Sequence, residues 1–92
     1  MSIIVEIPSP LRRFTEHRAT IEVASADTVR EALTCVVERY PPLDRHLFAR
    51  DGQMFAFVGV FVNGRDIRHL QKDRTPLQGG DTLTLIPAIA GG

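Results

Sequence analysis

Residues for metal and redox chemistry are scarce in this chain. Cys35 is the only cysteine, which excludes an internal disulfide, a thiolate zinc site and a four-cysteine iron–sulfur cluster. The three histidines, His17, His46 and His69, lie far apart in the sequence and form no i,i+4 pair. We therefore expect no metal site and no bound cofactor.

A net charge is also absent. Eleven basic and eleven acidic side chains give the 92 residues a formal charge of zero, so the chain lacks the positive field that drives binding to nucleic-acid phosphates. The first thirty residues show neither the basic start nor the apolar run of a signal peptide, and no apolar stretch is long enough to cross a bilayer. We expect a cytoplasmic protein that binds neither nucleic acid nor membrane.

Enzyme motifs are missing as well. The segment Gly79-Gly80-Asp81 lacks the lysine and the spacing of a phosphate-binding P-loop. The sequence contains no close-set constellation of acid, base and nucleophile. We therefore do not expect the chain to be an enzyme, and any ATP-dependent chemistry has to come from a partner.

A helix is predicted between Thr28 and Tyr40. Thr28 followed three residues later by Glu31 is the pattern of a capping box, in which side chains satisfy backbone N–H groups at the start of a helix. Pro41-Pro42 stops the run. The apolar residues of this segment recur at the spacing of one helical face, and they are Val29, Ala32, Leu33, Val36, Val37 and Tyr40.

Five segments have the pattern of β-strands. Ser2 to Ile7 alternates in polarity, and Asn63-Gly64 is typical of a tight hairpin turn between two strands. The expected strands are residues 2–7, 20–23, 54–62, 65–67 and 82–86. Residues 11–19 are predicted to be a solvated connection, and 43–53 an irregular one with a short helical turn around 44–48.

This order of elements predicts an α+β protein with the β-grasp fold, in which one main helix covers one face of a mixed sheet of about five strands. The first and last strands are expected to lie side by side and parallel at the centre of the sheet. We expect residues 1–87 to form the domain and 88–92 to form a flexible tail, which reaches about 16 Å from the sheet if extended.

The sequence ends in the diglycine Gly91-Gly92. Glycine has no Cβ and adopts backbone angles closed to other residues, so such an end can thread a narrow channel in another protein. The carboxylate of Gly92 is therefore the candidate reactive group, and Ile89, Ala90 and Gly91 are the residues needed for entry into a partner's active site. The alternative is a frayed, inert end.

Both faces of the expected strand 54–62 are apolar. Phe55, Phe57 and Phe61 share one parity, and Val58, Val60 and Val62 share the other. Since one helix covers one face only, the other face can present an apolar patch to a partner. The candidate residues of this docking patch are Phe57, Val58, Val60, Phe61 and Ile86. Alternatively, the connection 43–53 covers that face.

Charges of both signs alternate between residues 65 and 74. This pattern is typical of an ordinary solvated surface, and docking to an acidic partner groove beside the tail is the alternative. The residues are Arg65, Asp66, Arg68, Lys72, Asp73 and Arg74.

Three blocks together resemble the ThiS/MoaD-type family of ubiquitin-like sulfur carriers. They are the capped helix from Thr28 to Tyr40, the block from Val60 to Ile67, and the stretch from Gly80 through Ile86-Pro87 to Gly91-Gly92. The resemblance spans the whole chain, and it is the order and spacing of the blocks that make it specific. The ending is closer to the molybdopterin synthase small subunit and the cysteine-pathway carrier than to the thiazole-pathway carrier, apart from Ile89 where valine is expected.

The resemblance implies a β-grasp fold and a defined chemistry at the last residue. An adenylating enzyme related to ubiquitin-activating enzymes uses ATP to activate the Gly92 carboxylate, which a sulfur donor then converts to a thiocarboxylate. The thiocarboxylate delivers sulfide to an acceptor biosynthetic enzyme. Cysteine biosynthesis is the favoured pathway on overall similarity, with molybdopterin or another sulfur-containing metabolite as the other possibilities.

Two alternatives from other functional classes remain at this stage. In one, the chain is a protein modifier joined through Gly92 to lysines of other proteins, which uses the same activation and differs in the attacking nucleophile. In the other, it is a non-catalytic β-grasp interaction domain with an inert tail.

Overall fold

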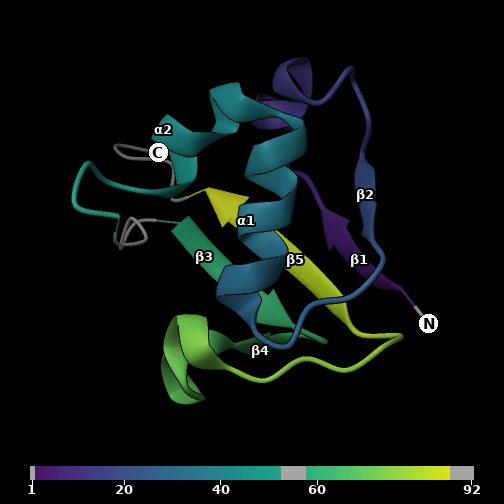
Figure 1. Ribbon diagram of the computed structural model, residues 1–92, viewed down its shortest axis with the longest axis vertical. Coiled ribbons are helices and arrows are strands. Elements are labelled where there is room, and N and C mark those ends of the chain that lie inside the picture. The colour runs from purple at the N-terminus through teal and green to yellow at the C-terminus, as the bar shows by residue number, and fades with distance from the viewer. Residues whose placement is uncertain (1, 53–57, 88–92) are drawn as a thin grey trace.

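A five-stranded mixed sheet with the strand order β2-β1-β5-β3-β4 is the frame of the molecule (Figure 1). The structure is a computed structural model that describes residues 2–52 and 58–87. At the centre of the sheet β1 and β5 are parallel, with Val5 opposite Leu83, and the other neighbouring strands are antiparallel. The strands are β1 (Ile3–Glu6), β2 (Thr20–Val23), β3 (Val58–Val62), β4 (Arg65–Asp66) and β5 (Thr82–Pro87). The predicted central parallel pair is confirmed.

The helix α1 (Val29–Arg39) begins where the capping box predicts it. The Thr28 hydroxyl oxygen accepts a hydrogen bond from the Glu31 N–H at 3.3 Å, and the Glu31 carboxylate accepts one from the Asp27 N–H at 3.4 Å. The side chains thus satisfy N–H groups on both sides of the cap. The predicted apolar face is buried except at Val37, which is only partly buried.

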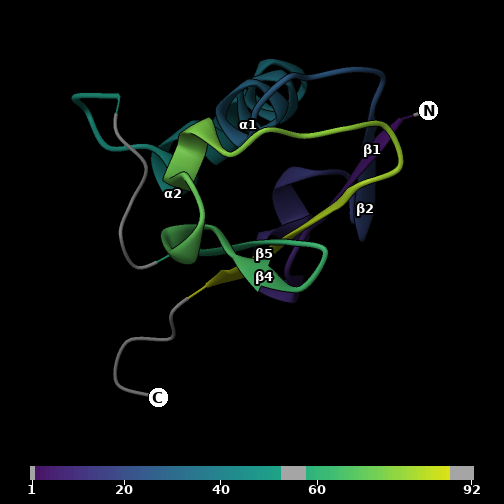
Figure 2. The same ribbon diagram turned by 90° about the horizontal axis from the view of Figure 1, so that it is seen from below.

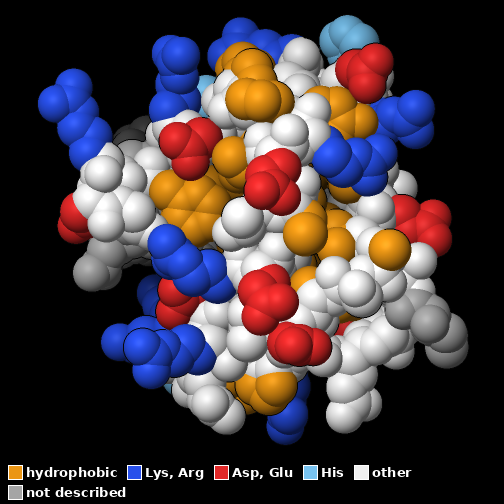
Figure 3. Space-filling model, in the orientation of Figure 1, with side chains coloured by type: hydrophobic (Ala, Val, Ile, Leu, Met, Phe, Trp, Pro, Cys, Tyr) orange, Lys and Arg blue, Asp and Glu red, His pale blue; other side chains and the backbone are white. Residues whose placement is uncertain are grey.

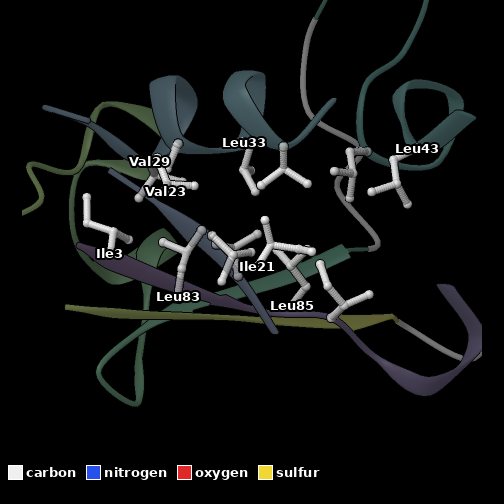
Figure 4. Packing of buried hydrophobic residues seen from close by; sticks show 14 of the residues in the cluster. Ile3, Ile21, Val23, Val29, Leu33, Leu43, Leu83 and Leu85 are labelled. Carbon is white, nitrogen blue, oxygen red and sulfur yellow. The ribbon is translucent and has the colours of Figure 1, made fainter. Parts of the chain in front are cut away.

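The helix α1 lies over one face of the sheet (Figure 2), and one layer of apolar side chains joins the two. In Figure 4, Val29 and Leu33 point from the helix toward Ile21, Leu83 and Leu85 on the strands. All five side chains are almost fully buried. The architecture is therefore the β-grasp fold that the order of elements predicts.

The connection after α1 also lies on the helix side of the sheet. It forms η2 (Pro41–Leu43) and the short helix α2 (Asp44–Leu47), which confirms the predicted helical turn. Leu43 and Leu47 are fully buried in the same core as α1, and Figure 2 shows α2 on the α1 side of the sheet. The possibility that this connection covers the other face is therefore wrong for its described part, residues 43–52.

The prediction of a solvated connection over residues 11–19 is wrong in part. The turn η1 (Ser9–Phe14) packs Leu11 and Phe14 against the core. Thr15 is fully buried, and its hydroxyl lies 3.2 Å from the Arg12 carbonyl oxygen and 3.0 Å from that of Arg18. A 3₁₀ turn has three residues per turn and one buried hydroxyl adds no apolar periodicity, so the sequence pattern did not reveal this packing.

Replacing Thr15 by valine is expected to destabilise the fold by about 1–3 kcal/mol, because valine keeps the shape of the buried side chain but cannot donate to the Arg12 and Arg18 carbonyl groups as the hydroxyl does. Urea unfolding monitored by circular dichroism measures the change. Thr34→Val is the matched control, since Thr34 is exposed and donates only to the Arg30 carbonyl of its own helix at 2.8 Å. Equal losses in the two variants would contradict the structural role of Thr15.

Candidate functional site

The face of the sheet that points away from α1 is called the outer face here. Along each strand its residues alternate with those of the core, so Ile86 is exposed while Leu85 is buried. The outer-face residues of the three central strands are Ile4, Glu6, Gly59, Phe61, Thr82, Thr84 and Ile86. α1, η2 and α2 all lie on the opposite side, so none of them covers these residues.

An apolar strip lies on the outer face where β3 meets β5. Ile86 is 50% exposed and stands opposite Gly59 in the strand register. A Cβ added at Gly59 would lie 3.2 Å from the Phe61 Cε1 atom and 3.2 Å from the Ile86 carbonyl oxygen. The ring of Phe61 therefore lies over the glycine beside Ile86, an arrangement in which an aromatic side chain covers a strand glycine.

Polar groups flank this apolar strip. Thr84 donates a hydrogen bond of 2.6 Å to the Glu6 carboxylate. Asp66, opposite Phe61 in the register, forms a 2.7 Å ion pair with Arg68. The side-chain hydrogen bonds from Arg68 lower the pKa of Asp66, so this carboxylate is ionised and paired at neutral pH. The outer face thus combines an apolar centre with a carboxylate and an ion pair.

The structure separates the residues that were predicted to form one docking patch. Phe61 and Ile86 share the outer face, whereas Val60 is 2% exposed in the core. The prediction that Val60 belongs to the docking patch is therefore wrong. The reason is strand parity, because Val60 and Val62 both point toward α1. Phe57 and the side chain of Val58 lie outside the described residues.

The start of β5 is held by a hydrogen-bonded turn network. Asn63 and Gly64 have φ values of 50° and 85°, which confirms the predicted tight turn. The Asn63 side chain accepts from the Thr82 N–H at 2.9 Å and donates to the Asp81 carboxylate at 3.0 Å, and this carboxylate also accepts from the Gln78 N–H. The sequence predicts the Asn63-Gly64 turn but not the side-chain hydrogen bonds that join it to Asp81 and Thr82.

The sequence continues from Pro87 at the end of β5 into the predicted reactive tail. Ile89, Ala90, Gly91 and Gly92 lie outside the described residues, so their role stays a prediction. β5 itself is hydrogen-bonded to β1 on one side and β3 on the other. The tail is therefore joined to a strand that hydrogen bonds to β1 and β3 hold in position.

Metal-binding clusters and membrane-spanning helices are absent from residues 2–52 and 58–87. Within these ranges no three His, Cys, Asp or Glu side chains gather as ligands for a metal ion. No helix in the same part of the chain is both long and apolar enough to span a bilayer. Cys35 is partly buried against the core beside the apolar face of α1.

The sequence profile of the ThiS family matches residues 5–92, almost the whole chain. The chain belongs to the ThiS family. This is a family of ubiquitin-like sulfur carriers, which are not enzymes themselves. A full-length relative is the sulfur carrier protein CysO of Mycobacterium tuberculosis, 31% identical over 94 residues that cover all of both chains.

Two further comparisons place this ThiS-family chain among its relatives. A chain in the crystal structure of the Amycolatopsis orientalis BexX/CysO complex is 32% identical with a TM-score of 0.87, and the match covers 98% of this chain and 99% of that one. Small archaeal modifier protein 3 of Haloferax volcanii is 35% identical over 65 residues, which cover 71% of this chain and 70% of the relative.

Two neighbouring residues of β5 test which face of this ThiS-family sheet is buried. Leu85→Ala is expected to cost about 2–5 kcal/mol, because Leu85 is 2% exposed and its removal leaves a cavity. Ile86→Ala is expected to cost less than about 1 kcal/mol, since half of Ile86 is already in water. Chemical denaturation of both variants gives the comparison, and the reverse order of losses would contradict the assigned faces.

Proposed function

We propose that this protein is a sulfur carrier whose Gly92 carboxylate is adenylated by a partner enzyme and then converted to a thiocarboxylate. The observation that carries the proposal is the family match, which extends through the diglycine to residue 92. The position of β5 supports it, because a strand bonded on both sides holds the root of the tail in one place. A partner can then accept the tail from a defined direction.

The chemistry explains why a partner and ATP are required. A carboxylate is ionised at neutral pH and its oxygen is a poor leaving group. Attack of the Gly92 carboxylate on the α-phosphate of ATP releases pyrophosphate and forms an acyl adenylate. A sulfur nucleophile from a donor then displaces AMP, and the product is a thiocarboxylate. By analogy with a thiolate of low pKa, this group is anionic and nucleophilic near neutrality.

We further propose that the outer face docks the activating enzyme. Exposed apolar surface next to a functional segment is typical of protein interaction sites. The strip of Phe61 and Ile86 lies on the two strands β3 and β5, and β5 leads into the tail. Contact with this strip would align the tail with the active site of the partner.

For the receiving pathway we propose cysteine biosynthesis, with molybdopterin synthesis as the alternative. The support is the similarity over full length to the sulfur carrier CysO of Mycobacterium tuberculosis. The CysO of Amycolatopsis orientalis forms a complex with BexX, which supports the proposal that this chain also binds a protein partner.

A second candidate function is protein modification through Gly92. The observation in its favour is the 35% identity to small archaeal modifier protein 3. Both functions need the same adenylate, and they differ in whether sulfide or a lysine amine attacks it. Covalent adducts on denaturing gels, lost when Gly92 is deleted, would favour modification.

Incubation with the cognate activating enzyme, ATP and a sulfur donor is expected to add 16 Da to the intact protein, because one carboxylate oxygen is exchanged for sulfur. Intact-mass spectrometry measures the change, and an alkylating agent applied after Cys35 has been blocked captures the product. The captured adduct should map to Gly92. Deletion of Gly92 is the control, and an unmodified terminus in the complete mixture would overturn the carrier proposal.

Ile86→Asp is expected to lower kcat/KM for adenylation at least about tenfold, because it places a charge in the proposed apolar contact. Leu70→Asp is the matched control, since Leu70 is also an exposed aliphatic residue, 37% exposed, away from the strip. Pyrophosphate release measures both rates at equal protein concentration. Equal effects of the two variants would contradict docking at the outer face.

A further inference from the structure

A basic groove lies at the turn that follows β1. Ser9, Pro10, Arg12, Arg13 and His17 line this groove, whose volume is about 540 Å³. Residues 9–18 contain three arginines and one acidic residue, Glu16, which is a formal charge of +2. Since the whole chain has a net charge of zero, the rest of it carries −2. The groove therefore concentrates positive charge that composition alone does not reveal.

Local contacts hold the basic side chains of the groove in place. The Arg12 Nε donates a 3.0 Å hydrogen bond to the Ile7 carbonyl, and the Arg13 guanidinium lies 4.9 Å from the centre of the Phe14 ring. The Phe14 ring also lies beside the ring of His46, with ring centres 4.7 Å apart. A ligand would meet arginines that are already ordered, which reduces the entropy lost on binding.

The backbone of the groove is equally constrained. The Arg12 carbonyl accepts hydrogen bonds from the N–H groups of Thr15 at 3.0 Å and of His17 at 2.8 Å. The hydroxyl of Thr15, which is fully buried, lies within reach of the same carbonyl. His17 has a φ of 63° and its side chain is exposed at the groove. Burial of Thr15 thus fixes the turn that carries the charges.

The groove lies at the end of the sheet where the tail begins. β1 and β5 are parallel with Glu6 opposite Thr84, so both strands run toward the same edge. η1 follows β1 at this edge, and β5 ends there at Pro87. Figure 4 shows the turn after β1 and the arrowhead of β5 at the same end of the sheet. In Figure 3 the top of the molecule carries blue (Lys, Arg) and pale blue (His) side chains, with a red (Asp, Glu) side chain beside them.

The charged segment 65–74 lies at the opposite end, so its predicted alternative role beside the tail is wrong. η1 contacts η2, which follows the C-terminal end of α1. At the N-terminal end of α1, the Val29 N–H donates to the Thr75 carbonyl, and Arg30 pairs with Asp73 at 2.9 Å. The segment 65–74, which contains the η4 turn (Lys72–Arg74) and also has a formal charge of +2, is therefore a control surface of similar charge at the opposite end of the sheet from Pro87.

We propose that the groove binds an acidic segment of the partner enzyme that accepts the tail. Arginine guanidinium groups form the strongest charge-assisted hydrogen bonds with carboxylates, and the Ser9 hydroxyl adds a donor beside them. Complementary charge beside the tail guides encounter and raises the association rate. The identity of the partner rests on the proposed function, whereas the preference for acidic polypeptide does not.

The first experiment tests the ligand class without any enzyme. An octaglutamate peptide is titrated into the ¹⁵N-labelled full chain at low salt, and amide chemical shifts are followed by NMR. The expected result is a set of shifts concentrated at residues 9–18, reduced in Arg13→Glu and restored in Arg13→Lys. Shifts of equal size at residues 65–74, or no shifts at either surface, would overturn the inference.

The second experiment uses adenylation by the cognate activating enzyme. Arg13→Glu is expected to lower kcat/KM about tenfold at low ionic strength with kcat unchanged, and to weaken the salt dependence. Arg13→Gln should give a smaller loss. Arg74→Glu is the matched control, because Arg74 is exposed on η4 and the charge change is the same.

The two experiments separate the failure of this inference from that of the proposed function. If the wild type acquires a thiocarboxylate but Arg13→Glu behaves like Arg74→Glu, the groove does not dock the partner and the inference is overturned. If the wild type is not activated at all, the proposed function fails, and the peptide titration alone decides whether the groove binds acidic polypeptide.

Discussion

The parallel pairing of β1 with β5 is the constraint on which the rest of the structure depends. It places the last strand at the centre of the sheet, where β1 and β3 bond to its two edges and Leu83 and Leu85 are buried beneath α1. A strand in this position cannot shift by one residue without moving its apolar side chains to the outer face. The root of the tail is therefore fixed by the stability of the whole domain.

The same pairing creates a sheet with two different faces. One face supplies the core, and the other leaves Phe61 and Ile86 beside Glu6 and the Asp66–Arg68 ion pair. Gly59 contributes through its missing side chain, because a Cβ there would lie only 3.2 Å from the Phe61 Cε1 atom, closer than an ordinary contact. A small domain with a single main helix thus keeps an apolar strip exposed on its outer face without any additional element.

The pairing also determines what lies next to the tail. Because β1 and β5 run in the same direction, the turn after β1 and the end of β5 meet at one edge. The arginines of η1 are held there by the Ile7 carbonyl and the Phe14 ring. Charge complementarity speeds the encounter of two proteins and apolar contact stabilises their complex, so the proposed contacts at the groove and at the outer face can act one after the other on the same partner.

The sequence by itself determined the elements and their order. The capping box at Thr28, the helical apolar face and the Asn63-Gly64 turn are local patterns, and each depends on residues a few positions apart. They suffice for the β-grasp fold, and together with the diglycine they suffice for the family. Local patterns are sufficient because each helix or turn is defined by hydrogen bonds between residues close in the sequence, and each helix or strand by the spacing of its own apolar residues.

The tertiary structure decided everything that depends on which surfaces meet. Both parities of the strand 58–62 are apolar in sequence, so only packing against α1 assigns Val60 to the core and Phe61 to the outer face. In the sequence Thr15 looks like an ordinary polar loop residue. Only the fold buries it and brings its hydroxyl to the carbonyl oxygens of Arg12 and Arg18. The positions of the two charged segments relative to the tail follow from strand direction. These properties arise between residues far apart in the sequence, where local patterns carry no information.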